Sequence, residues 1–132
     1  MTVPSWHTFA NNPQAIAALY RDVPALQRAC LMSLSLRQDG GVLVVLKLPR
    51  YPDSPPKRWS AHSNAVVMEL GFWEVSGFSI REWRGSAVVD VTVARADSDS
   101  LEITMTGDDS YMTLRSSNMY IQSFSDYIES SE

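Results

Sequence analysis

Three carboxylates stand at polar positions within alternating apolar segments, where acid–base chemistry is one use for them. Glu69, Asp90 and Glu102 would converge if the strands that hold them were neighbours, and two converging carboxylates are a common arrangement for moving protons. The solvent-facing side of an antiparallel sheet also carries its charge at such alternating positions. We favour this second interpretation, so the sequence predicts no catalytic residue and no enzyme.

The residues that could hold a metal ion or act as a nucleophile lack the required spacing. His7 and His62 are far apart in the sequence and do not form the i, i+4 pair of a helical zinc site. Cys30 is the single cysteine, and no serine stands in a G-x-S-x-G setting. The segment 97–100 begins like a calcium-binding loop, but the glycine at loop position six and the glutamate at position twelve are absent. We expect neither a metal ion nor a cofactor.

Two tryptophans are the most informative of the remaining side chains. Trp73 and Trp83 are each out of phase with the main apolar face of their expected strands. Exposed tryptophans on a rigid sheet serve as anchors in protein interfaces, and the other reading is a second packing layer beneath an N-terminal helix. Together with the three carboxylates, Trp73 and Trp83 are the candidate binding residues for a protein partner.

The two parts of the chain carry opposite charge. Residues 1–60 hold 7 Lys or Arg against 3 Asp or Glu, whereas residues 61–132 hold 4 against 12. A net charge of −4 with scattered basic residues argues against direct binding to nucleic acid. The acidic second part would attract a basic protein partner, or it would serve only to keep the protein soluble.

Length and composition indicate one domain. A chain of 132 residues with 45% hydrophobic residues can bury one core. The longest unbroken aliphatic run, residues 42–46, is far shorter than the roughly 20 residues that a bilayer crossing needs. Residues 1–20 contain no apolar stretch of the secretory type, and a lone cysteine fits a reducing compartment. We therefore expect a cytoplasmic protein without a membrane partner.

One N-terminal helix is predicted. Asn12 is suited to accept a hydrogen bond from a free amide at the helix start, and Pro13 fits the first helical position. The apolar stripe that follows has the spacing of one helix face: Ile16, Leu19 and Tyr20. Pro24 places the end of the helix near residues 20–22.

The rest of the chain is predicted to form short strands joined by turns. Residues 31–48 form the clearest hairpin, with Met32, Leu34 and Leu36 expected on its buried face. Prolines exclude regular structure over residues 49–57. Further strands are expected over residues 65–73, 78–83, 88–93, 101–106, 111–115 and 119–124. The sequence thus predicts a single α+β domain over residues 1–132, a mainly antiparallel meander of about seven or eight strands with the helix packed on it.

The order of these elements and one proline-rich stretch resemble a known family. Residues 46–59 place an aliphatic strand before the pattern P-x-[YF]-P-x-x-P-P-x-[RK]-W. Trp6, Asn12-Pro13 and residues 19–26 precede this stretch, and the strand entry 64–67 and residues 125–128 follow it. Over nearly the whole chain the arrangement is similar to the Immunity protein 50 family of bacterial polymorphic toxin systems.

The resemblance implies a small cytoplasmic protein that binds a cognate toxin and inactivates it without catalysis. It implies no catalytic residues and carries over no binding residue, because interfaces tend to differ between members. The acidic second part of the chain adds the expectation that this toxin is basic, such as a nuclease domain, and Trp73 and Trp83 would anchor it. An exposed sheet edge would also allow a homodimer. The alternative function is a small-molecule or lipid-binding β domain whose aromatic residues line a cavity.

Overall fold

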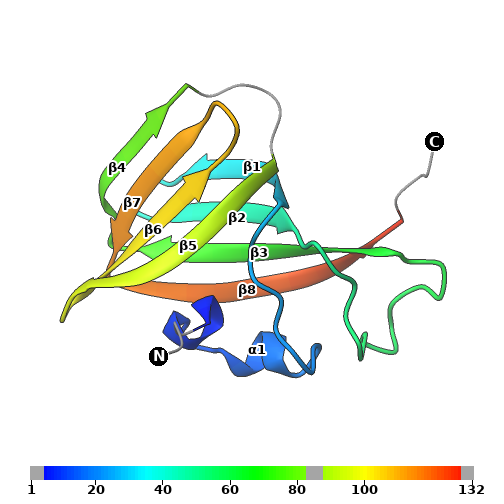
Figure 1. Ribbon diagram of the computed structural model, residues 1–132. Coiled ribbons are helices and arrows are strands. Elements are labelled where there is room, and N and C mark those ends of the chain that lie inside the picture. Colours follow the sequence, from blue (N-terminus) through cyan, green and yellow to red (C-terminus); the bar gives the residue numbers. More distant parts are fainter. Residues whose placement is uncertain (1–4, 83–87, 129–132) are drawn as a thin grey trace.

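The computed structural model describes residues 5–82 and 88–128. Over these residues the chain forms eight β-strands and two short helical segments (Figure 1). A 3₁₀ turn, η1 (Trp6–Phe9), and a short helix, α1 (Gln14–Ala17), come first. The strands that follow are β1 (Ala29–Leu36), β2 (Val42–Lys47), β3 (Ala65–Trp73), β4 (Ser76–Arg81), β5 (Val88–Asp97), β6 (Ser100–Thr106), β7 (Tyr111–Ser116) and β8 (Asn118–Tyr127). Every strand expected from the sequence is present, and β5 and β8 are longer than expected.

The strands form one antiparallel sheet in the order β4-β7-β6-β5-β1-β2-β3-β8. The antiparallel prediction is confirmed, but the meander is only partial, because β4 pairs with β7 and β8 pairs with β3. The connection after β7 explains this order. The Ser117 amide donates to the Trp73 carbonyl oxygen at 3.2 Å, and the Ser116 hydroxyl donates to the same oxygen at 2.7 Å. β8 therefore begins beside the end of β3 and does not run back along β7.

The sheet is strongly bent, and its two halves enclose the core (Figure 1). One half holds β1, β2, β3 and β8, and the other holds β5, β6, β7 and β4. A short seam joins them, in which Ala29 pairs with Val89 and Cys30 pairs with Val88. Alternate side chains of each strand, such as Val44 on β2, point into the concave side and are buried.

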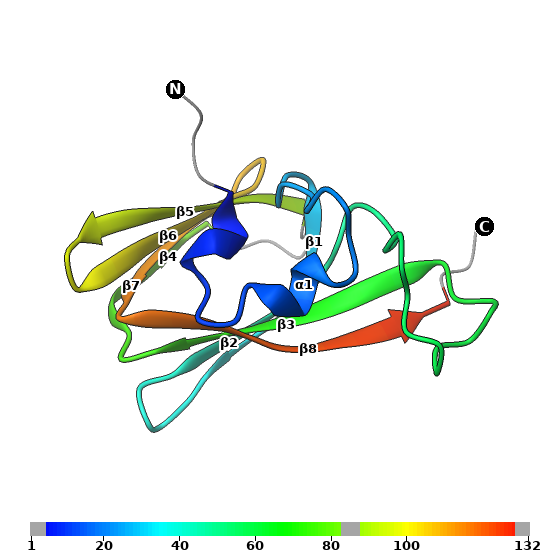
Figure 2. The same cartoon turned by 90° about the horizontal axis from the view of Figure 1, so that it is seen from below.

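The N-terminal segment fills the concave side. Figure 2 shows η1 and α1 lying between β5 and β8. Trp6, Ile16 and Leu26 are buried there, and the Trp6 ring N–H donates to the Pro24 carbonyl oxygen at 2.9 Å. The Val91 amide of β5 donates to the Leu26 carbonyl oxygen at 2.6 Å. The core therefore lies between the bent sheet and this segment.

The N-terminal helix is shorter than the sequence predicts, and a mainly β description fits the fold better than α+β. The expected apolar stripe is nevertheless buried: Ile16, Leu19 and Tyr20. The proline-rich loop, residues 48–64 between β2 and β3, ends the helix early. Its Ser54 amide donates to the Leu19 carbonyl oxygen at 3.0 Å, and its Asp53 carboxylate accepts from the Arg21 amide at 2.9 Å. A longer helix would need these same backbone groups. Neither helical segment of the described chain has the length or apolar character to cross a membrane.

Asn12 does not cap this helix. Pro13 is the N-cap residue, and no side-chain cap hydrogen bond is formed there. The Asn12 side-chain amide instead binds both backbone groups of Ile121 on β8, donating to the carbonyl oxygen at 2.9 Å and accepting from the amide at 2.9 Å. The Asn11 amide donates to the Met119 carbonyl oxygen at 2.8 Å. The N-terminal segment thus covers part of the outer edge of β8, which would otherwise present unpaired backbone groups.

The buried face expected for β1 is wrong at two of its three residues. Pairing with β2 shifts between Leu31 and Ser33, so Met32 lies in a bulge and is 46% exposed. Leu36 returns to the concave side but lies at the end of the sheet and is 64% exposed. Only Leu34 packs against the core. A bulge shifts the phase of a strand by one residue, and sequence alternation alone does not reveal it.

Candidate protein-binding surface

The described candidate residues share the convex face of the sheet. Glu69 and Trp73 alternate with buried side chains along β3 and therefore point outward. Asp90 on β5 and Glu102 on β6 also alternate with buried residues and are exposed. Trp83 lies outside the described residues.

These residues are not brought together. β2 and β1 stand between β3 and β5, so Glu69 and Asp90 are three strand spacings apart, at roughly 4.8 Å each. Asp90 accepts a hydrogen bond from the Arg28 amide at 2.7 Å, and a Glu102 carboxylate oxygen lies 3.7 Å from Nε of Arg115. In the described part of the chain, no three His, Cys, Asp or Glu side chains are grouped to hold a metal ion. Asp90 and Glu102 lie on neighbouring strands, but Asp90 pairs with Thr106 and Glu102 pairs with Ala94, so the two are offset by four residues. These three carboxylates therefore form no converging pair.

Trp73 packs beneath the β1–β2 turn and not beneath the N-terminal helix. A Cβ added to Gly41 would lie 2.4 Å from ring carbon Cζ3 of Trp73. The Arg37 guanidinium lies 5.9 Å from the ring centroid, within cation–π range. The Val75 amide donates to the Gly40 carbonyl oxygen at 3.1 Å, which joins the β3–β4 turn to the same hairpin. Trp73 is thus half-buried in a structural contact, and an interface role for its remaining surface stays a prediction.

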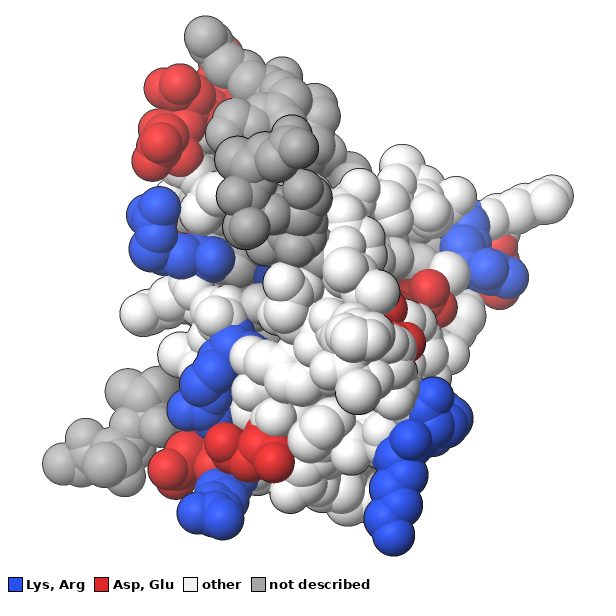
Figure 3. Space-filling model, turned by 90° about the vertical axis from the view of Figure 1, so that its right-hand side faces the viewer, with Lys and Arg blue, Asp and Glu red and all other residues white. Residues whose placement is uncertain are grey.

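Across the described residues, the acidic side chains of the second part do not form one continuous surface. Asp97 ends β5 and Asp99 lies in the β5–β6 turn, whereas Asp108 and Asp109 lie in the β6–β7 turn at the opposite end of β6. Figure 3 faces the end with the proline-rich loop and shows acidic and basic side chains in small separate groups. Electrostatic attraction would therefore come from one local group and not from the second part as a whole.

The β6–β7 turn borders a hollow at one outer edge of the sheet. This hollow has a volume of about 410 Å³ and is lined by Arg81, Glu82 and residues 106–111. Tyr111 is 41% exposed, and the Arg81 guanidinium lies 5.6 Å from its ring centroid. β4, which carries Arg81, is the last strand of the sheet. Carboxylates, an exposed ring and a strand edge meet here, and protein-binding surfaces combine such features.

Sequence reasoning missed this combination. It predicts residues 107–109 only as a turn and β4 only as one member of a meander. The pairing of β4 with β7 places Arg81 opposite Tyr111 and so brings the turn beside the strand edge. Local alternation does not reveal a pairing that departs from chain order. The one available signal in the sequence was Tyr111, an aromatic residue at the start of the short strand β7.

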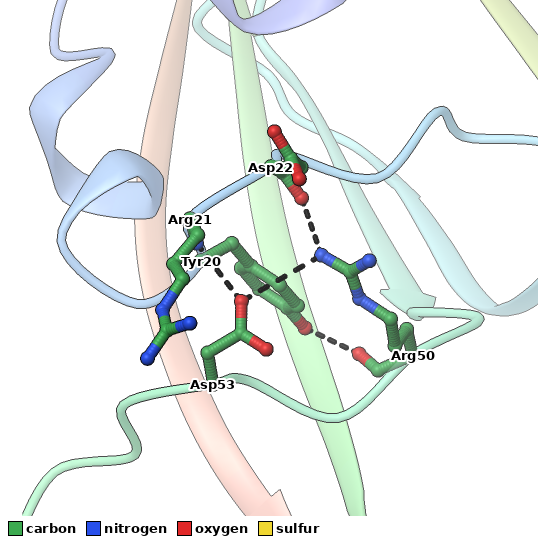
Figure 4. Close-up of polar contacts among 5 residues, drawn as sticks. All are labelled: Tyr20, Arg21, Asp22, Arg50 and Asp53. Carbon is green, nitrogen blue, oxygen red and sulfur yellow. Dashed lines mark hydrogen bonds and ion pairs between the residues drawn. The ribbon is translucent and has the colours of Figure 1, made fainter.

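The proline-rich loop is bound to the N-terminal segment by a polar cluster (Figure 4). The Tyr20 hydroxyl donates to the Arg50 carbonyl oxygen, and the Arg50 guanidinium donates to the Asp22 carbonyl oxygen. The Asp53 carboxylate accepts from the Arg21 amide at 2.9 Å and lies 3.8 Å from Nη2 of Arg50. Burial raises the pKa of the Tyr20 hydroxyl above its usual value of 10, so this hydroxyl remains a hydrogen-bond donor at alkaline pH values where an exposed tyrosine ionises. These contacts fit the structural role expected of four prolines in one loop.

The comparison with known proteins settles the family. The family model of Immunity protein 50 matches residues 12–127, and this match covers most of the chain. This protein belongs to the Immunity protein 50 family. The resemblance noted in the sequence is thereby confirmed, whereas no curated protein and no solved structure matches the chain. The matched range contains every described strand as well as the proline-rich loop.

In this Immunity protein 50 member the loop is also tied to β8. The Asp126 carboxylate accepts from the Ser60 amide at 3.0 Å and from the Ser63 hydroxyl at 2.6 Å. Tyr51 and Trp59, which belong to the family pattern, contact each other with ring centroids 6.1 Å apart. Asp126 therefore holds the loop at the edge of β8, while the ring pair stabilises the loop itself.

Replacing Asp126 by Asn should lower the melting temperature at neutral pH and have less effect in acid. The hydrogen bonds from Ser63 and Ser60 hold the pKa of the Asp126 carboxyl below its usual value of 3.8. A carboxyl whose pKa is lower in the folded protein than in the unfolded protein stabilises the fold at pH values above the unfolded pKa. This contribution is lost as the pH falls through the folded pKa. Melting temperatures of D126N and wild type should therefore converge as the pH is lowered below 3.8. Asp99→Asn is the matched control, and a D126N effect that stays constant with pH would contradict this account.

Proposed function

We propose that this protein neutralises a cognate bacterial toxin by binding it non-covalently and covering the surface that the toxin needs. Membership in the Immunity protein 50 family over residues 12–127 carries this proposal. Occlusion without catalysis is proposed because the carboxylates first considered for acid–base chemistry are separated, Glu69 from the other two by strand order and Asp90 from Glu102 by four residues along their strands. The protein would act in the cytoplasm of the cell that makes the toxin.

The proposed partner is a toxin domain with a basic binding surface, such as a nuclease. Asp108 and Asp109 support this choice, because they stand beside the exposed Tyr111 at the edge of the sheet. Complementary charge accelerates the encounter of two proteins. An aromatic side chain that becomes buried in the interface is a common anchor residue and contributes strongly to the affinity. We propose no direct contact with nucleic acid or with a membrane, because the net charge of −4 disfavours both.

Titration of the toxin encoded beside the gene for this chain tests the proposal. We expect toxin activity to fall in proportion to the added protein and to vanish near an equimolar ratio, because occlusion is stoichiometric. Cells that express the toxin should survive only when they also express this protein, and an inactive toxin variant is the control for toxicity. Absence of protection at every ratio would exclude the proposed function.

The alternative, a small-molecule or lipid-binding domain, would require space between the two halves of the sheet. Trp6, Ile16 and Leu26 of the protein itself are buried on the concave side. A hollow of about 370 Å³ beside Trp6, also lined by Val91 and Val93, is the place where such a ligand would bind. Native mass spectrometry of the purified protein separates the two functions, since a retained lipid or metabolite would favour the alternative.

A further inference from the structure

The two outer edges of the sheet differ in what covers them. The edge of β8 is bound by Asn11 and Asn12 and, through Asp126, by the proline-rich loop. β4 pairs with β7 on one side, and the described residues place no strand on its other side (Figure 1). An unpaired strand edge presents backbone donors and acceptors to a second polypeptide.

The β6–β7 turn fixes the hydrogen-bonding pattern of β7. The Gly107 amide donates to the Ser110 carbonyl oxygen at 2.9 Å, so these two residues form a hydrogen-bonded pair. Such pairs alternate with non-hydrogen-bonded pairs along an antiparallel hairpin. The next pair, Thr106 with Tyr111, is therefore not hydrogen-bonded within this hairpin. Tyr111 consequently directs its backbone amide and carbonyl toward β4.

The same alternation identifies the open backbone groups of β4. Arg81 lies opposite Tyr111 and uses its amide and carbonyl in the bond to β7. Ile80, the preceding residue, lies opposite Met112 and directs its amide and carbonyl away from β7. The Ile80 side chain lies on the same side as the buried Met112 but is 41% exposed. An added strand would bond these backbone groups and cover this side chain.

The charge beside this edge is negative. Asp108 and Asp109 are exposed at the tip of the β6–β7 turn and line the hollow together with Glu82 and Arg81. Among the described residues that line the hollow, three carboxylates against one guanidinium give a formal charge of −2. A strand with Lys or Arg side chains is therefore the complementary occupant.

We propose that residues 78–81 of β4 bind an extended, basic segment of the toxin, which joins the sheet as an additional antiparallel or parallel strand. This inference rests on the proposed function and names the surface through which it would operate. Main-chain hydrogen bonds to Ile80 would supply affinity, and Asp108 and Asp109 would select a basic segment. The bulge between Ser76 and Ser79 interrupts the regular strand, so the toxin segment would pair with the C-terminal part of β4.

A second copy of this chain fits the same edge less well. In an antiparallel β4–β4 pair, Ser76 of one copy would lie near Asp108 and Asp109 of the other, and Arg81 would lie at the far end. The two carboxylates would then face residues 76–80, which contain no basic residue. Arg115, which lies opposite Ser76 on β7, is already within 3.7 Å of Glu102. A basic toxin segment satisfies both the backbone groups and the charge.

Ile80→Pro tests the backbone part of the proposal. Proline removes the amide that faces the open side, and edge strands tolerate proline where the lost amide points to solvent. The probe is the inactive toxin domain encoded beside this gene, and its dissociation constant is measured by calorimetry. We expect I80P to weaken binding at least about tenfold, which corresponds to roughly 1.4 kcal/mol. Ile80→Val keeps the amide and a branched side chain, so I80V should stay within about twofold of wild type.

A second variant covers the case in which I80P does not fold. Ile80→Lys keeps the backbone, replaces a partly exposed side chain and puts positive charge where the basic segment would dock. We expect I80K to melt near wild type and to bind at least about tenfold more weakly. If wild type protects cells while folded I80P or I80K binds as tightly as wild type, the edge is not the interface and the proposed function survives. If wild type itself does not bind, the proposed function fails first.

The charge part of the proposal has its own matched pair. Asp109→Asn and Asp99→Asn make the same change in exposed turns at opposite ends of β6. At about 0.1 M salt we expect D109N to slow association about threefold and D99N to leave it nearly unchanged, because the Debye length of about 10 Å is then shorter than β6. Equal effects of the two variants would overturn the choice of a basic segment. Sedimentation of the protein alone completes the test, since a dimer that I80P dissociates would assign the edge to a second copy and overturn the proposal.

Discussion

Replacing Gly41 by alanine is expected to destabilise the protein by about 1–3 kcal/mol. The added Cβ would lie 2.4 Å from Cζ3 and 2.6 Å from Cε3 of the Trp73 ring, well inside contact distance. The ring cannot simply move away, because the Arg37 guanidinium lies over it and the Val75 amide binds the same turn. Urea unfolding followed by tryptophan fluorescence measures the loss as a lower midpoint with an unchanged slope.

Gly40 provides the matched control for this prediction. A Cβ at Gly40 meets nothing within 4 Å, but its φ of +89° disfavours any side chain. Gly40→Ala should therefore cost about 1 kcal/mol through backbone strain alone. Trp73→Leu separates the two causes, because a smaller side chain removes the clash with alanine at position 41. The cost of G41A should fall in the W73L background while that of G40A stays the same, and additive costs would refute the steric account.

Local signals in the sequence were sufficient for the strands and most turns. Period-two alternation located β3 and β6, since Met68 and Ile103 are buried as their phase requires. The β5–β6 turn was also predictable, because Asp97 accepts hydrogen bonds from the Asp99 amide at 2.8 Å and the Ser100 hydroxyl at 3.0 Å. Such an aspartate turn depends only on neighbouring residues.

Tertiary contacts decided what the sequence could not show. The N-terminal helix stops early because the proline-rich loop binds the backbone of Leu19 and Arg21, and that loop is distant in sequence. The β4–β7 pairing likewise depends on the Ser116–Ser117 connection to the end of β3. The candidate surface follows from this pairing, so alternation predicted its residues as ordinary strand and turn positions. The family pattern, by contrast, lies in one continuous stretch and was recognisable from the sequence.

Replacing Asn12 by alanine is expected to destabilise the protein by about 1–3 kcal/mol, because it leaves two backbone groups of β8 without partners. The Asn12 side chain donates to the Ile121 carbonyl oxygen and accepts from the Ile121 amide, each at 2.9 Å, so it acts as one residue of an adjoining strand. Ile121 is only 4% exposed, which limits replacement of these bonds by water. Urea unfolding gives the change in free energy, and light scattering should show more self-association through the uncovered edge.

Two substitutions separate this role from a helix cap. Asn11 contributes its backbone amide to Met119 while its side chain is exposed, so Asn11→Ala should change stability by less than about 0.5 kcal/mol. Serine is as good as asparagine at a helix N-cap, so Asn12→Ser would be nearly neutral if capping were the function of this residue. A serine hydroxyl is too short to bind both groups of Ile121, and we therefore expect N12S to lose nearly as much stability as N12A. If N12S matched wild type instead, the covering of β8 by Asn12 would contribute little to the fold.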